Sequence, residues 1–344
     1  MLNSEFRMQN WAALCLIHNA QFIVIKMKHI FLITIAIVTL FSCKSQKTGE
    51  ETSNVDDVAT QVVNFDGSNA YNLVKAQCDF GPRVPGTAAH SKCAEWLEQS
   101  LKQSCDTVIV QQGQVTTFDG KTLNIKNFVG SINPSNSDRI LLLAHWDCRP
   151  WADNDPDPAK HHEPVMGAND AASGVAVLLE LARLMKEKTP NIGVDILLVD
   201  AEDWGTNDVE ESWALGTQYW AKNPHVAGYT ARFGILLDMV GAKGAKFYKE
   251  YESQQWAPAV VSEVWDVAHK SGYGAYFENN FGTAVTDDHV VVNGMGIKCI
   301  DIIDTRQNGG FFDGWHTTSD TMDWIDQGTL KAVGQVVANV VYSY

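Results

Sequence analysis

The sequence predicts an α/β protein: a single domain with a central mixed, mostly parallel sheet flanked by helices. Four short, nearly continuous apolar runs are typical of strands buried on both faces of a parallel sheet. They alternate with segments of helical periodicity, as in a doubly wound sheet. Each run leads into acidic residues or a histidine. Ligands of such sheets bind outside the carboxyl ends of the strands, so we expect these side chains to converge on one crevice.

The predicted elements follow one another along the chain. A helix is expected over 88–103, where Leu97 and Leu101 share one side. A stronger helix is expected over 173–188, because its apolar residues recur at helical spacing and lysine and glutamate occupy its end. A closing helix is expected over 328–342. The four runs that predict strands are 140–147, 194–203, 233–238 and 297–301.

Residues 1–43 have the pattern of a secretory signal peptide with a lipobox. Lysines precede the apolar stretch 30–41, which is too short to cross a membrane as a helix. Cys43 closes a segment that resembles a bacterial lipobox, so we expect it to carry a lipid and to become the mature N-terminus, with Met27 as the natural start. The expected location is the bacterial cell envelope, periplasmic and anchored to a membrane. The alternative is an ordinary buried apolar element with an incidental cysteine.

Residues 44–61 are polar and predict a flexible tether, and 62–344 contain no linker, repeat or charge block, which predicts one catalytic domain. The net charge of −15 argues against a nucleic-acid partner or an anionic membrane surface, since either needs a basic face. Five cysteines follow Cys43. An exported protein could pair some of them, but the connectivity cannot be deduced.

The candidate catalytic and metal-binding residues are acids and one histidine. Asp170 lies in a turn-rich stretch before the second helix, where it could bind metal or simply cap that helix. Glu202 and Asp203 follow an apolar strand as a pair, so one could bind metal while the other exchanges protons. His316 stands in a loop, and a lone loop histidine is usually a surface residue. The adjacent Trp315 and the upstream acids favour a functional role, and the set suits zinc. The chain is therefore expected to be a metal-dependent hydrolase or transferase.

Asp170, Glu202-Asp203, Asp238 and Trp315-His316, in this order, resemble the glutaminyl-peptide cyclotransferases, which share the fold of the zinc aminopeptidases. The segments 145–155 and 167–174 resemble the bacterial branch of that family. The segments 81–87 and 287–289 match as well. The resemblance extends from about residue 80 to the last helix.

The resemblance implies one zinc ion bound by Asp170, Asp203 and His316, which leaves a coordination position open as in catalytic sites. Glu202 would be the general acid and base, and Asp238 and Asp287 would form hydrogen bonds within the active site. The substrate pocket would be walled by Trp315, with Phe311 at its rim and Trp204 and Trp213 as further candidates. A cis peptide bond is expected between Asp170 and Ala171.

The implied reaction closes an N-terminal glutamine into pyroglutamate and releases ammonia. The implied partners are peptides and exported proteins that begin with glutamine. One departure concerns Asp301, which stands where animal members of the family carry a histidine. It could have a rebuilt role in the active site, or it could be a salt-bridged or solvated acid at a strand end, with Arg149 and Arg306 as candidate partners.

Two other functions remain open. An aminopeptidase of the same fold would bind a second zinc through His145 and Asp238. A non-catalytic lipoprotein would bind peptides or glycans after loss of its metal site. Three features favour the cyclotransferase: the tryptophan beside His316, an aspartate at 203 in place of the usual glutamate, and the close match of 145–155.

Overall fold

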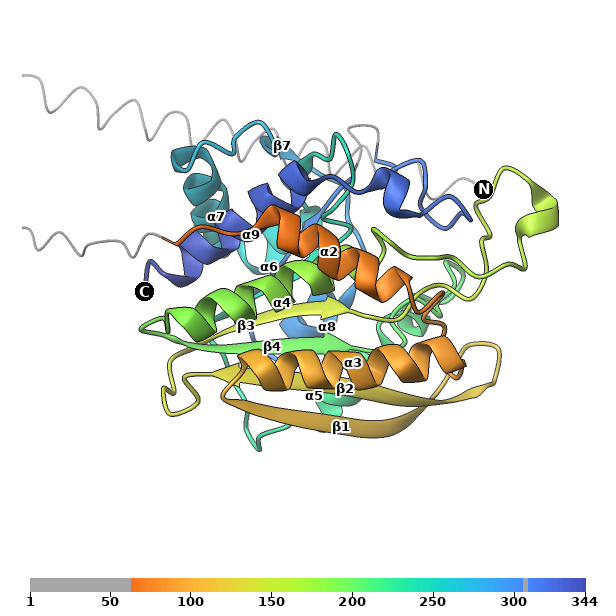
Figure 1. Cartoon of the computed structure of the whole chain (residues 1–344), viewed down its shortest axis with the longest axis horizontal. Helices are drawn as coiled ribbons and strands as arrows, with labels where there is room; N and C mark the ends of the chain where they lie inside the picture. The colour runs from red at the N-terminus through yellow and green to blue at the C-terminus, as the bar shows by residue number, and fades with distance from the viewer. Residues whose placement is uncertain (1–62, 306–308) are drawn as a thin grey trace, which may run out of the picture. The chain divides into compact units, whose positions relative to one another are not determined.

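The computed structural model describes residues 63–305 and 309–344, which pack as one compact unit (Figure 1). The expected signal peptide, lipobox and tether lie outside the described residues, as does Arg306. The predicted fold class is confirmed: a mixed sheet lies between layers of helices. No helix in the described part of the chain is long and apolar enough to cross a membrane.

The main sheet has six strands in the order β1-β2-β4-β3-β5-β8. The first two strands pair antiparallel, β2 is antiparallel to β4, and the remaining four strands are parallel. The bounds are β1 Thr107–Thr116, β2 Thr122–Ile132, β3 Arg139–His145, β4 Gly193–Val199, β5 Phe233–Asp238 and β8 Cys299–Ile303. A separate parallel pair consists of β6 Phe247–Lys249 and β7 Phe277–Phe281.

All four predicted strand runs form strands, but the last one is displaced. It begins at Cys299 rather than Ile297, because the side chain of Asn293 accepts a hydrogen bond from the Cys299 amide and donates one to its carbonyl. The strand extends to Ile303, which pairs with Asp238 of β5. Asp301 therefore lies in the middle of the strand, fully buried, and not at a solvated strand end.

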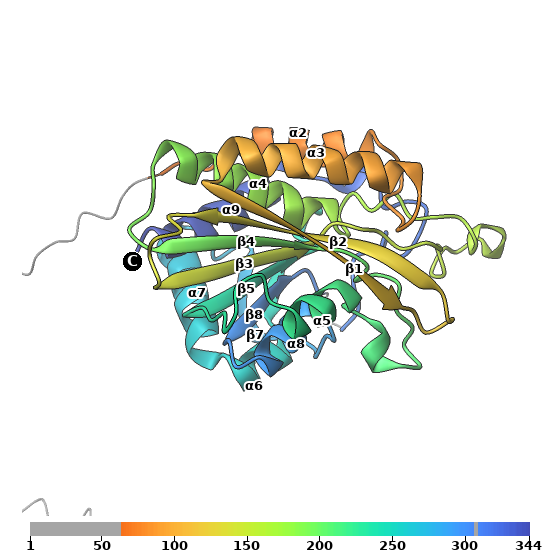
Figure 2. The ribbon, with the colours of Figure 1, turned by 90° about the horizontal axis from the view of Figure 1, so that it is seen from below.

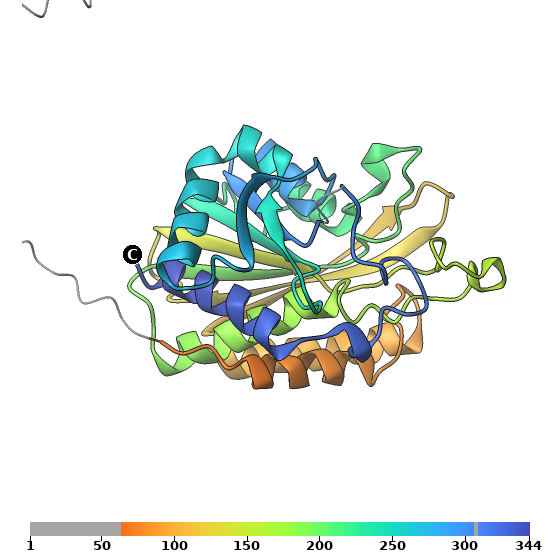
Figure 3. The same cartoon turned by 90° about the horizontal axis from the view of Figure 1, so that it is seen from above.

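Helices cover both faces of the sheet (Figures 2 and 3). One face carries α2, α3, α4 and α9, with α7 packed against α9; the other carries α5 and α8. The bounds are α2 Gly67–Cys78, α3 Ala88–Ser104, α4 Ala172–Glu187, α5 Leu215–Lys222, α6 Tyr251–Trp256, α7 Pro258–Lys270, α8 Asp288–Gly294 and α9 Gln327–Val341, with short 3-10 turns η1 Pro158–Lys160, η2 Glu210–Ser212 and η3 Met322–Trp324. The three predicted helices are α3, α4 and α9, each within one residue of the expected bounds.

The core is split by the sheet into two layers. Along β3, Leu142 and Ala144 join the cluster beneath α3, α4 and α9, while Leu141 and Leu143 join the cluster beneath α5 and α8. This alternation follows from the two-residue period of a strand. Because both faces are covered, the polar ends of the parallel strands are the places left for chemistry. The five described cysteines are all free thiols.

Candidate functional site

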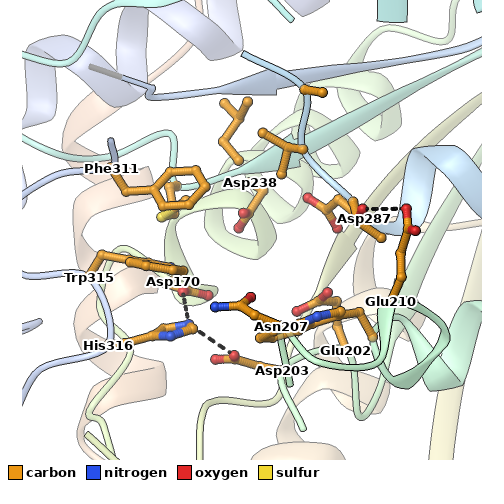
Figure 4. Close-up of a pocket in the computed structure, with 16 residues that line it drawn as sticks. Asp170, Glu202, Asp203, Asn207, Glu210, Asp238, Asp287, Phe311, Trp315 and His316 are labelled. Atoms are coloured by element: carbon orange, nitrogen blue, oxygen red, sulfur yellow. Dashed lines mark hydrogen bonds and ion pairs between the residues drawn. The ribbon is translucent and has the colours of Figure 1, made fainter. Parts of the chain in front are cut away.

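Asp170, Asp203 and His316 meet at the carboxyl end of the parallel strands. His316 Nε2 lies 3.2 Å from Asp203 Oδ1 and 3.7 Å from Asp170 Oδ2 (Figure 4). One donor atom from each residue lies within 4.8 Å of the others, and all three residues are buried. They come from three places in the chain: the turn before α4, the loop after β4 and the loop before η3. The structure thus assembles the ligand set that the resemblance implies.

The backbone around these residues is held by buried carboxylates. Asp147 accepts hydrogen bonds from the amides of Glu202 and Asp203, at 3.1 and 3.3 Å. Asp320 accepts from the amides of Asn169 and Asp170, at 2.8 and 3.1 Å. The Asp170–Ala171 peptide bond is cis, as expected. These contacts direct the Asp170 and Asp203 side chains toward His316.

The donor set fits zinc. Two carboxylates and one imidazole are ligands that zinc accepts, and three protein ligands are the usual number for a catalytic zinc. Asp203 Oδ2 is buried and has no hydrogen-bond partner among the described residues. A buried carboxylate oxygen without a partner is costly, and a cation would satisfy it. Asp170 and Asp203 therefore present the charge, and His316 the nitrogen, that a zinc ion requires.

Glu202 lies beside the ligands and lines the same pocket. Burial raises the pKa of Glu202 well above its ordinary value, and the negative charge of Asp287 raises it further. A raised pKa is typical of a carboxyl group that acts as a general acid and base. Asp287 itself also has a raised pKa, first through burial and then through the charge of Asp238.

His145, at the end of β3, lies between acids. Its Nε2 is 3.0 Å from Asp170 Oδ1 and 3.2 Å from Asp238 Oδ1, and its Nδ1 is 3.4 Å from Asp147. Burial alone would lower the pKa of His145, but the hydrogen bonds to Asp147, Asp170 and Asp238 outweigh it and hold the pKa well above its usual range. His145, Asp170 and Asp238 could also hold a metal ion, so the ligand geometry alone does not give the number of ions.

Asp301 belongs to a second buried polar cluster behind the pocket. His289 Nε2 lies 3.2 Å from Glu250 Oε2, and His289 Nδ1 lies 4.0 Å from Asp301 Oδ2. Burial and the neighbouring charges of Asp287 and Asp238 raise the pKa of Asp301 well above its ordinary value. Arg149, the one candidate partner that is described, pairs with Asp153 and Asp203 instead. Asp301 is thus part of a buried cluster with His289 and Glu250, and Arg149 is not its partner.

The pocket above the ligands has a volume of about 350 Å³. Trp315 and Phe311 form an aromatic wall, with ring centroids 4.4 Å apart (Figure 4). Trp213 completes the wall, and its ring lies parallel to that of His316. Asp238 and Asp287 also line the pocket, as expected.

Trp204 does not lie where the sequence led us to expect it. Its ring is buried against Trp151 and Leu215, and its Nε1 donates to Asp119 rather than facing the pocket. It is a packing residue of the domain, and of the two candidates Trp204 and Trp213 only Trp213 lines the pocket. The two tryptophans flank one loop, so their sequence positions alone did not distinguish them.

Sequence reasoning also missed the pocket rim. Asn207 and Glu210 from the loop after β4, and Thr286 before α8, line the pocket. Asp147 was expected among the acids at the strand ends, but its role in holding a ligand-bearing loop was not predicted. Asp320, which holds another such loop, was missed altogether. Asp320 carries no comparable local signal, because its partners are 150 and 151 residues away in the chain.

Comparison with known proteins agrees with this geometry. The profile of peptidase family M28 matches residues 127–341. The crystal structure of Bacteroides thetaiotaomicron glutaminyl cyclase bound to N-acetylhistamine is 49% identical and covers 82% of this chain and 99% of that chain, with a TM-score of 0.81. A structure from the same organism described as a leucine aminopeptidase precursor is also 49% identical, covering 83% and 99%, with a TM-score of 0.81. The Drosophila melanogaster glutaminyl-peptide cyclotransferase is 25% identical over 293 residues, 76% of this chain and 77% of its own.

Proposed function

This chain belongs to peptidase family M28, and we propose that within this family it is a zinc-dependent glutaminyl-peptide cyclotransferase. The observation that carries the proposal is the pocket itself. A buried Asp-Asp-His ligand set, a carboxyl group with a raised pKa and an aromatic wall share one cavity of about 350 Å³. The substrate would be an N-terminal glutamine, whose α-amine attacks its own side-chain carboxamide.

The residues of the chain account for the steps of this reaction. Zinc held by Asp170, Asp203 and His316 would polarise the carboxamide oxygen as a Lewis acid. Glu202 takes a proton from the attacking amine and delivers it to the leaving nitrogen. The new bond joins the amine nitrogen to the carboxamide carbon, and the bond to the nitrogen that departs as ammonia breaks. No protein nucleophile is required, because the substrate supplies its own.

The aromatic wall positions the glutamine side chain for ring closure. Trp315, Phe311 and Trp213 line the pocket with aromatic rings against which a glutamine side chain can be held in its folded form. Holding the reacting atoms together removes much of the entropic cost of ring closure. Asp287, Asp288 and Asp203 place negative charge around the Glu202 carboxyl group, which favours its protonated form after the first proton transfer.

We propose one zinc ion per chain. The second candidate group needs His145 as a ligand, and a metal-binding imidazole must be neutral. His145 Nε2 instead lies 3.0 Å from Asp170 Oδ1 and 3.2 Å from Asp238 Oδ1, which supports a role as hydrogen-bond partner of these two acids. Elemental analysis of the purified protein tests the proposal: two tightly bound zinc ions per chain would contradict it and favour an aminopeptidase.

Incubation with the dipeptide Gln-Ala distinguishes the candidate functions. We expect ammonia and a lactam-capped dipeptide, detected by a coupled ammonia assay and by a mass loss of the peptide. An aminopeptidase would release free glutamine and alanine. A non-catalytic peptide-binding protein would leave the dipeptide intact. Free amino acids, or no reaction in the zinc-loaded protein, would each overturn the proposed function.

We also propose that residues 1–43 export the protein and that Cys43 anchors it to a bacterial membrane, facing the periplasm. The support is the short apolar stretch 30–41 followed by the lipobox-like segment. Its substrates would then be exported peptides and proteins with N-terminal glutamine. Metabolic labelling with an alkyne fatty acid should mark the wild type and fail to mark Cys43→Ser. Equal labelling of both would refute the anchor.

A further inference from the structure

Two loops meet at the mouth of the pocket, and no pattern in the sequence predicts their contact. The loop between β4 and α5 contributes Glu210, and the loop before α8 contributes Thr286. The Thr286 hydroxyl donates a hydrogen bond of 3.0 Å to Glu210 Oε1 (Figure 4). Both residues are exposed, and both line the pocket. We call Glu210 and Thr286 the rim bridge.

Each side of the rim bridge is anchored to the domain. On the Glu210 side, the buried Ser212 accepts a hydrogen bond from the Thr206 amide at 2.8 Å, which closes the loop on itself. On the Thr286 side, the Val285 amide donates to the buried Glu250 carboxylate at 3.0 Å. The Glu210 carboxylate is therefore held at the mouth by fixed backbone and by the Thr286 hydroxyl.

The charge of the residues that line the pocket is predominantly negative. Among the described residues that line it are six carboxylates and no lysine or arginine. Five of these carboxylates belong to the ligand set or surround the reacting group. Glu210 is the remaining one, and it is exposed at the mouth, where the rest of a substrate must leave the pocket. Its negative charge can therefore interact with a part of the substrate that lies outside the reaction centre.

We propose that Glu210 is a specificity-determining residue, which binds a basic side chain on either of the first two residues that follow the N-terminal glutamine. The inference rests on the proposed function: the glutamine fills the pocket, so the next residues lie at the mouth. Consecutive Cα atoms are about 3.8 Å apart, and lysine and arginine side chains extend well beyond that spacing. The preferred substrates are peptides with Lys or Arg in these positions, and acidic residues there are disfavoured.

Four tripeptides test this inference: Gln-Lys-Ala, Gln-Glu-Ala, Gln-Ala-Lys and Gln-Ala-Glu. The ratio of kcat/KM between the basic and the acidic member of each pair measures the preference. Glu210→Gln keeps the shape and the bond from Thr286 but removes the charge. An exposed ion pair is typically worth 0.2–1 kcal/mol, so the ratio should fall about two- to fivefold in at least one pair, through KM rather than kcat. Added salt should reduce the wild-type ratio in the same way.

Glu211→Gln is the matched control, because Glu211 is the exposed neighbour that does not line the pocket and the variant has the same net charge. Its ratios should equal those of the wild type. Unchanged ratios in Glu210→Gln, or equal losses in both variants, would overturn the inference while lactam formation still upholds the proposed function. Absence of lactam from all four peptides would overturn both.

Discussion

At the scale of single residues, Glu202 and Asp203 show how adjacent acids acquire different tasks. Asp147 holds the amides of both, yet Asp203 turns toward His316 while Glu202 faces the pocket beside Asp287. The preceding Ala201 has a φ of +53°, which is rare for a residue with a side chain. This local twist after β4 allows neighbouring side chains to serve one site in two ways.

Replacing each acid should therefore give a different defect. Glu202→Gln keeps the shape and the metal ligands but cannot move protons, so kcat should fall by about 10²–10⁴-fold while zinc stays bound. Asp203→Ala should lose the zinc. Turnover of Gln-Ala and elemental analysis of the same preparations check both outcomes. Zinc lost from Glu202→Gln and kept by Asp203→Ala would require the two roles to be exchanged.

At the scale of elements, the site depends on contacts that join loops far apart in sequence. Asp320, four residues after His316, accepts the amides of Asn169 and Asp170. It thereby connects the loop that carries one ligand to the turn that carries another. From the other side, the buried Arg83 donates to the carbonyls of Met166 and Gly167 at 2.5 and 2.6 Å. The turn before α4 is thus held at both of its ends.

Asp320→Asn should weaken zinc binding without removing a ligand. An amide presents one acceptor oxygen where the carboxylate presents two, so one of the two backbone bonds is lost. Replacing a residue that orients a metal ligand typically costs about 10–100-fold in metal affinity. Competition with a chromogenic chelator measures that affinity. Asp323→Asn, which changes an exposed aspartate in the neighbouring turn η3, should bind zinc like the wild type. Equal affinities in all three proteins would contradict the role of Asp320.

The opposite end of the sheet is held by Asp195 on β4. It accepts two hydrogen bonds from Arg139, at 2.6 and 2.7 Å, and others from Ser131 and Tyr229. Burial alone would raise the pKa of Asp195, but the bonds from Arg139 and Ser131 outweigh it and lower the pKa below its ordinary value. A lowered folded-state pKa contributes stability above the unfolded-state pKa, near 4, and this stability is lost as the pH falls further.

Asp195→Asn should destabilise the domain at neutral pH by about 3 kcal/mol, because it leaves the largely buried Arg139 without its charge partner. The difference in unfolding free energy from the wild type should begin to shrink below about pH 4, where Asp195 of the unfolded wild type takes up a proton, and should vanish as the pH falls through the lower pKa of the folded state. Denaturant titrations at pH 7 and pH 3 measure it. Asp138→Asn, at an exposed pair with Arg232, should change little. A constant difference at both pH values would contradict the ionic role.

At the scale of the whole molecule, the residues that stabilise the fold and the residues that form the site lie in different parts of the domain. The two hydrophobic layers on either side of the sheet hold the domain together. Buried acids gather at the carboxyl ends of the parallel strands, where Asp170, Asp203, Asp238 and Asp287 lie in one pocket. In a protein of net charge −15, this concentration of negative charge opposes folding unless protons or a cation neutralise it.

Removing zinc should therefore lower the thermal stability of the whole domain. A metal present at about 1,000 times its Kd stabilises the folded state by roughly 4 kcal/mol, which corresponds to a fall in Tm on the order of 10 °C after chelation. Differential scanning fluorimetry with and without dipicolinate measures it, and added zinc should restore the original Tm. A Tm that does not change on complete removal of the metal would show that the ligands are stable as a network of hydrogen bonds alone.

The sequence by itself determined the fold class, three helices, four strands and the residues that meet at the strand ends. The helices and strands follow from the local periodicity of apolar residues. The residues that meet follow from the rule that parallel strands of a sheet have their carboxyl ends at the same edge. Neither inference requires knowing where each side chain points. Asp170, Glu202, Asp203 and His316 were recognisable for that reason. The resemblance of the chain to the glutaminyl-peptide cyclotransferases made four neighbouring residues recognisable: Asp238, Asp287, Phe311 and Trp315.

Only the tertiary structure decided which way the side chains point and which distant segments meet. Trp204 packs inward and Trp213 lines the pocket, although the two residues stand at the two ends of one loop. Asp301 lies inside its strand, because Asn293 fixes where that strand begins. The partners of Asp320 and the Glu210–Thr286 bond join positions 76 to 151 residues apart. Such contacts arise from packing between elements, which no local pattern of residues encodes.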